Sequence, residues 1–121
     1  MGRNQRVGHW GEEVACTYLR AHGYEIVDRN VRTPYGEIDL VARTEGFTVF
    51  VEVKARSSRS LGPPEIAVTP RKQRHLLACA AHYAQAHDID HWQIDVVAVQ
   101  KTGSQTEIQH FENAVAQLGE S

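Results

Sequence analysis

Two strand-like segments carry charges where apolar side chains are expected, and they constrain the fold more than any other feature of the chain. They are residues 36–41, which read Gly-Glu-Ile-Asp-Leu-Val, and residues 50–54, which read Phe-Val-Glu-Val-Lys. Both are rich in β-branched and apolar residues that alternate with polar ones, as in strands with a buried face. Glu45 and Gly46 lie between them and mark a turn, so we expect a β-hairpin.

The charged side chains of this hairpin are expected to lie close together on its two neighbouring strands. Side chains along a strand point to alternate faces, so Asp39 shares a face with Val41 (away from Ile38), and Glu52 shares one with Lys54. An isolated charge is costly to bury, so these groups must pair with one another or bind a cation. Two carboxylates suit a hard divalent cation. A purely structural ion pair is the alternative interpretation.

Further motifs extend this pattern over most of the chain, from about residue 8 to residue 99. In order they are Gly11-Glu12-x-x-Ala15, Tyr24, Arg29-Asn30, Gly36-Glu37-Ile38-Asp39-Leu40, Phe50-Val51-Glu52-Val53-Lys54 and Asp95-Val96-Val97-Ala98-Val99. The Asp39 and Glu52-x-Lys54 arrangement resembles the signature of the PD-(D/E)xK nuclease superfamily. The ordered set resembles the YraN family of small bacterial endonuclease-like proteins, related in fold to archaeal Holliday-junction resolvases.

The fold class follows from the helical and strand-like segments of the chain together with this resemblance. Helical spacing is found at 8–22 and at 70–86, where Thr69 and Pro70 provide an N-cap and a first helical residue. The other strand-like segments are 24–30, 92–99 and 106–111. Alternating strands and helices predict an α/β fold with a central mixed sheet, an antiparallel meander plus a parallel strand, flanked by helices. The restriction-endonuclease-like strand order is implied by the resemblance.

Glu12 and Gln73 are further candidates for the site. Glu12 lies on the flank of the helical stripe that faces the sheet, and related resolvases carry an acidic residue on this helix, so the resemblance makes it a third acidic ligand. The alternative is a partly exposed glutamate stabilised by the helix dipole. Gln73 points inward near the start of the second helix, where it could bind a water or a phosphate. Its alternative role is to cap local backbone groups.

Basic residues on both sides of the segment that joins 50–54 to the second helix are candidates for nucleic-acid contacts. They are Arg56 and Arg59 in the polar loop expected at 55–64 and, in the first turn of the second helix, Arg71, Lys72 and Arg74. Helix N-termini bind phosphate, and a basic loop can follow a nucleic-acid backbone. Asp95 matches the resembled family, but Gln93-Ile94 replace the Arg-Phe that usually precedes it, which leaves the role of Asp95 open.

The composition is that of an ordinary single-domain protein. The 121 residues suit one domain with a single core, for which we expect disordered ends near 1–6 and 118–121. The net charge of −2 argues against a protein that coats polyanions generally. No segment has the apolar length of a membrane helix or the pattern of a signal peptide, so we expect no membrane partner and a cytoplasmic location.

These observations favour a Mg²⁺- or Mn²⁺-dependent endonuclease. Asp39, Glu52 and Glu12 would hold the cation, and Lys54 and Gln73 would assist catalysis. The substrate would be DNA, including branched or junction DNA, with flaps, single strands and RNA left open. Related resolvases act as two-fold dimers, so a homodimer is also expected from the resemblance. The alternatives are a catalytically inactive nucleic-acid-binding module with the same fold and a structural domain in which the charges form a salt-bridge network.

Overall fold

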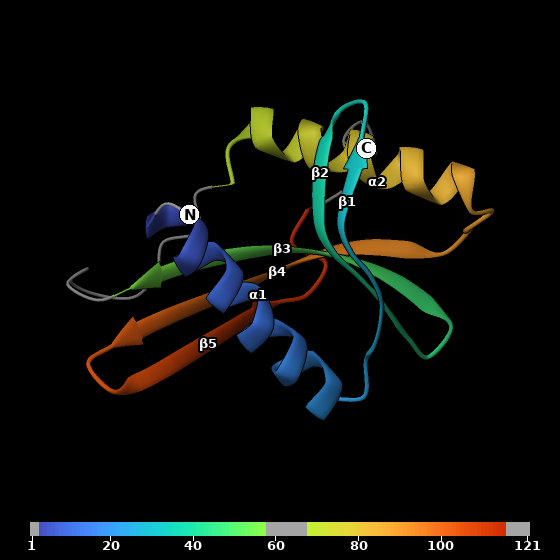
Figure 1. Ribbon diagram of the computed structural model, residues 1–121. Helices are drawn as coiled ribbons and strands as arrows, with labels where there is room; N and C mark the ends of the chain where they lie inside the picture. Colours follow the sequence, from blue (N-terminus) through green and yellow to red (C-terminus); the bar gives the residue numbers. More distant parts are fainter. Residues whose placement is uncertain (1–2, 58–67, 116–121) are drawn as a thin grey trace.

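The computed structural model describes residues 3–57 and 68–115 and forms one mixed sheet with a helix on each face (Figure 1). The elements in chain order are α1 (Arg3–Ala21), β1 (Glu25–Thr33), β2 (Gly36–Thr44), β3 (Phe47–Ser57), α2 (Pro70–Ala86), β4 (Trp92–Thr102) and β5 (Gln105–Phe111). The strands lie in the order β1-β2-β3-β4-β5. The predicted α/β class and its helix-covered mixed sheet are confirmed.

The strands pair as predicted, with an antiparallel meander followed by a strand that pairs parallel. β1, β2 and β3 pair antiparallel, and the turn at Glu45 and Gly46 joins the last two. β4 pairs parallel with β3, from Thr48 beside Trp92 to Ser57 beside Lys101. α2 belongs to the crossover that a parallel connection requires. β5 pairs antiparallel with β4 and is an edge strand, as predicted.

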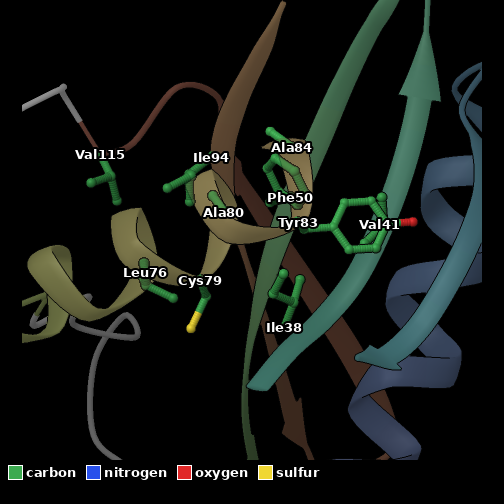
Figure 2. Close-up of a cluster of buried hydrophobic side chains, with 10 residues drawn as sticks. All are labelled: Ile38, Val41, Phe50, Leu76, Cys79, Ala80, Tyr83, Ala84, Ile94 and Val115. Atoms are coloured by element: carbon green, nitrogen blue, oxygen red, sulfur yellow. The ribbon is translucent and has the colours of Figure 1, made fainter. Parts of the chain in front are cut away.

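Each face of the sheet buries its own apolar cluster against one helix. The α1 cluster contains Ala15, Cys16, Leu19, Leu40, Ala42, Val49, Val51, Val97 and Val99. The α2 cluster contains Ile38, Val41, Phe50, Leu76, Cys79, Ala80, Tyr83, Ala84, Ile94 and Val115 (Figure 2). Neighbouring residues of β2 and β3 divide between the two clusters because strand side chains alternate. The face that holds Val41 and Phe50 is therefore the face of α2.

β2 changes its surroundings part-way along its length. It pairs with β1 down to Gly36, but its pairing with β3 ends at Leu40 beside Val51. The end of the β1–β2 hairpin bends toward α2 (Figure 1), where Thr33 Oγ1 donates a hydrogen bond to Cys79 Sγ over 3.4 Å. This bend turns Ile38 into the α2 cluster beside Phe50 (Figure 2), so the prediction that Ile38 faces away from Val41 is wrong.

The element boundaries match the local signals where those signals are strong. Thr69 caps α2 by accepting a hydrogen bond from the N–H of Lys72 over 3.1 Å, and α2 ends at Ala86 as predicted. α1 begins at Arg3, earlier than the expected residue 8. β3 runs to Ser57, so residues 55–57 are strand and not loop, because pairing with β4 continues beyond the apolar stretch. The rest of the predicted loop lies outside the described residues.

Candidate functional site

The site lies at the point where β2 leaves β3. On the N-terminal side of Leu40 the backbone of β2 no longer pairs with β3. The side chain of Asp39 makes the contact with β3 instead. Its Oδ2 accepts a hydrogen bond from the backbone N–H of Val53 over 2.9 Å. Asp39 is thereby fastened to β3 next to Glu52. The period-two argument, which placed these two residues on one face, is supported by this contact and by the shared α2 cluster of their neighbours Val41 and Phe50.

The carboxylates of Asp39 and Glu52 are close enough to influence one another. The pKa of Asp39 is raised to about 7, first because the group is buried and then because the negative charge of Glu52 repels its ionised form. The hydrogen bond from Val53 acts in the opposite direction, and protonated Asp39 is further favoured by a hydrogen bond with Glu52. Two neighbouring, partly or fully buried carboxylates that resist carrying two charges form an arrangement that a bound cation would relieve.

Two lysines approach the same oxygen of Glu52. Nζ of Lys54 lies 3.8 Å from Oε2, and Nζ of Lys72 lies 3.1 Å from it. The Glu52 side chain is only 9% exposed, whereas those of Lys54 and Lys72 are 39% and 40% exposed. The negative charge is therefore buried, and both ammonium groups lie on its solvent side.

Lys72 is the site residue that the sequence interpretation placed elsewhere. It was expected among the basic residues that contact phosphate, but its nearest charge is a buried carboxylate of β3. The helical spacing of the sequence does indicate that Lys72 points inward. Lys72 precedes Leu76, the first buried residue of α2, by four positions, and so lies on the inward stripe of the helix. The identity of its partner on β3 could come only from the tertiary structure.

Glu12 approaches the site from the opposite face, through the close packing of α1 on β3. A Cβ built on Gly11 would lie 2.5 Å from Cβ of Ala55, so only glycine allows this approach. Glu12 is half-buried, and its charge contributes to the raised pKa of Asp39, though less than that of Glu52. Glu13 points outward as expected, where it binds Arg29 with an N–O distance of 2.7 Å.

The donor set suits a small hard cation with few protein ligands. Across the part of the chain that the structure describes, no three His, Cys, Asp or Glu side chains gather into a complete ligand set. Glu12 therefore does not join Asp39 and Glu52 as a third direct ligand in this geometry. Two carboxylates nevertheless fit Mg²⁺, which keeps several waters and is commonly bound through one or two carboxylates.

The other predicted site residues lie around this centre with different neighbours. Nε2 of Gln73 donates a hydrogen bond to the backbone oxygen of Val68 over 2.9 Å, which is the capping role given as its alternative. Arg71 and Arg74 are exposed on the first turn of α2. Arg56 extends from β3, and its Nε and one terminal nitrogen are buried without a hydrogen-bond partner among the described residues. Arg59 lies outside the described residues.

Asp95, whose role the sequence left open, belongs to the opposite face. It lies beside Val51, a member of the α1 cluster, and is fully buried. Its carboxylate accepts hydrogen bonds from Gln93 Nε2 over 2.8 Å and from the N–H of Asn113 over 2.9 Å, and it lies 2.7 Å from Nε2 of His110. These contacts join β4, β5 and the segment after β5, which gives Asp95 a structural role.

Comparison with known proteins identifies the family. The sequence model of uncharacterised protein family UPF0102 matches residues 11–99. The chain belongs to this family. It is 46% identical over 110 residues to a UPF0102 protein of Syntrophotalea carbinolica, covering 89% of each chain. It is 43% identical over 113 residues to a UPF0102 protein of Syntrophomonas wolfei, covering 92% of this chain and 98% of the relative. The suspected YraN relationship is thereby confirmed.

The matched region contains the whole cluster around Asp39 and Glu52, including Glu12 near its start and Lys72 on α2. The part of this UPF0102 protein that the structure describes contains no helix long and apolar enough to cross a membrane.

Proposed function

We propose that this UPF0102 protein is a Mg²⁺- or Mn²⁺-dependent endonuclease that hydrolyses phosphodiester bonds of DNA, including branched or junction DNA. The observation that carries the proposal is the Asp39–Glu52 pair, in which burial and the neighbouring carboxylate raise the pKa of Asp39 while two ammonium groups approach Glu52. An acidic pair that is largely withdrawn from solvent and lies next to lysines is suited to binding a cation and a phosphate together. The restriction-endonuclease-like arrangement of the sheet is consistent with this chemistry.

Each residue of the cluster has a role that follows from its position. Asp39 and Glu52 would hold the cation, with Asp39 oriented by the N–H of Val53. The chemistry that such a cation supplies is polarisation of a phosphoryl oxygen and activation of water. Lys54 would orient the attacking water or offset the negative charge that develops on the phosphate. Glu12 would strengthen the acidic character of the site without binding the cation directly, because its charge already acts on Asp39.

The basic residues would hold the nucleic acid by its backbone. Arg71 and Arg74 are exposed at the N-terminus of α2, where backbone N–H groups and the helix dipole also favour phosphate. Arg56 extends from the same strand as Lys54 and has buried nitrogens that an anion could satisfy. Arg59 remains a predicted backbone contact, and Gln73 remains a predicted auxiliary group for catalysis. Contacts of this kind position the backbone but do not read sequence.

The test is a cleavage assay on linear duplex, single-stranded, flap and four-way-junction DNA, each with Mg²⁺, Mn²⁺ or EDTA. We expect cleavage with the cations and none in EDTA. Asp39→Ala, Glu52→Ala and Lys54→Ala should each abolish cleavage while the far-UV circular dichroism spectrum is retained. Arg43→Ala, which removes an exposed charge at the far end of β2, is the matched control and should cleave normally. Cleavage that survives all three site variants would refute the assignment.

A catalytically inactive nucleic-acid-binding module is the second candidate. It is favoured by one observation, namely that Lys54 and Lys72 already offset the charge of Glu52 without any cation. Such a module would bind DNA at full strength in EDTA and would cleave none of the substrates. Binding measured by fluorescence anisotropy in EDTA and in Mg²⁺, beside the cleavage assay, separates the two candidates.

A further inference from the structure

Glu52 has one oxygen that two ammonium groups approach, and the shorter approach is the one from α2. Nζ of Lys72 is 3.1 Å from Oε2, within hydrogen-bond range, whereas Nζ of Lys54 is 3.8 Å away. An ammonium group at this distance occupies one lone pair of the oxygen and offsets the negative charge that attracts a cation. A cation that binds this oxygen must therefore compete with Lys72.

The two lysines differ in how they are attached to the site. Lys54 is on β3 with Glu52, two positions along the same strand, so the sheet itself keeps the two together. Lys72 reaches Glu52 from the first turn of α2, on a flexible four-carbon stem that is 40% exposed. Its ammonium group can turn into solvent without any movement of the backbone.

We propose that Lys72 is a positioning residue that neutralises Glu52 in the cation-free protein and competes with the divalent cation for Oε2, thereby setting the cation affinity of the site. The inference rests on the proposed function, because it takes Asp39 and Glu52 as the cation ligands. Without Lys72 the buried Glu52 would lose the closer of its two counter-charges, which is costly for a group that is 9% exposed. When the cation is bound, that counter-charge is no longer required, and Lys72 is released beside Arg71 and Arg74 at the phosphate-binding end of α2.

The test is calorimetric titration of Mn²⁺ into the full chain without nucleic acid, so that its readout is independent of activity. Lys72→Met keeps much of the apolar stem and removes the charge, and we expect it to bind Mn²⁺ roughly five- to tenfold more tightly than the unaltered protein. Lys72→Arg keeps the charge and should bind about as weakly as the unaltered protein. Arg71→Met removes a positive charge from the same turn at an exposed position and should change the affinity by less than about twofold.

The outcomes separate this inference from the proposed function. If the unaltered protein binds Mn²⁺ and Lys72→Met binds it equally or more weakly, the inference is overturned while the metal site stands. An equal gain in Mn²⁺ affinity in Lys72→Met and Arg71→Met would show a general effect of net charge, and this result would also overturn the inference. If every variant retains its far-UV circular dichroism spectrum but none binds Mn²⁺, the metal site itself is refuted, and the inference fails with it.

Discussion

Replacing Asp39 with asparagine should remove a pH-dependent cost that the acidic pair of Asp39 and Glu52 imposes on the cation-free fold. Asparagine keeps an oxygen that can accept the hydrogen bond from Val53, and its amide can donate to Glu52 as protonated aspartic acid does. The substitution therefore reproduces the neutral form of Asp39 at every pH. What it removes is the ionised form, which burial and the charge of Glu52 both disfavour.

The expected magnitude follows from the pKa of Asp39, which rises from 3.8 to about 7 on folding. Because the folded state holds the proton more tightly, this group's contribution to stability is complete below the unfolded pKa and declines as the pH rises through the folded pKa. Between pH 5 and pH 8 the free energy of unfolding should fall by about 2–3 kcal/mol through this group, as an upper estimate. The free energy of unfolding of the Asp39→Asn protein should not show this decline with pH.

The assay is urea denaturation followed by far-UV circular dichroism, with EDTA present, at several pH values between 5 and 8. The quantity to compare is the difference in unfolding free energy between Asp39→Asn and the unaltered protein, in which the titration of other groups largely cancels. This difference should shift in favour of the asparagine variant by up to about 2 kcal/mol as the pH rises. A difference that stays constant with pH, or that shifts in favour of the unaltered protein, would contradict the buried-pair geometry.

Three further substitutions test the packing and the contacts that hold the site in place, each by the same urea denaturation. Gly11→Ala would place a methyl group 2.5 Å from Cβ of Ala55, so α1 must move and the unfolding free energy should fall by about 1–3 kcal/mol; no loss would mean that α1 does not pack this closely. Asp95→Ala removes the buried acceptor for His110 and should cost about 3 kcal/mol or more, while retained stability would show that this network is dispensable. Thr69→Ala removes the N-cap of α2 and should lower the free energy of unfolding by about 1 kcal/mol. An unchanged urea midpoint would show that the cap does not stabilise the protein.

Features set by local chemistry could be predicted from the sequence of this UPF0102 protein. The Thr69-Pro70 pair marks the start of α2 because capping and a fixed proline φ act within one turn. The turn is signalled by Gly46, which adopts a φ of +84° without steric cost, and Glu45 before it also has a positive φ of +48°. Strand alternation predicted Asp39 and Glu52 on a common face from the side-chain period of two, although the same argument failed at the neighbouring Ile38.

Features that depend on a second element could not be predicted in this way. Ile38 turns into the α2 cluster because the end of the hairpin bends toward α2, and no local signal marks the residue where β2 leaves β3. The length of β3 was underestimated because backbone hydrogen bonds from β4 sustain it through a polar stretch. Such hydrogen bonds join backbone groups whatever the side chains are, so they leave little trace in the sequence.

The sequence by itself determined the kinds of element, the mixed sheet between two helices and the pair of carboxylates at the centre. The tertiary structure decided which charges meet that pair. Lys72 is separated from Glu52 by twenty positions and reaches it only because the α2 crossover places its first turn beside Glu52. Asp95 likewise acquires its partners from β5 and the segment that follows. Contacts between residues far apart in the chain depend on how whole elements pack, and that packing is a collective result of the two buried clusters.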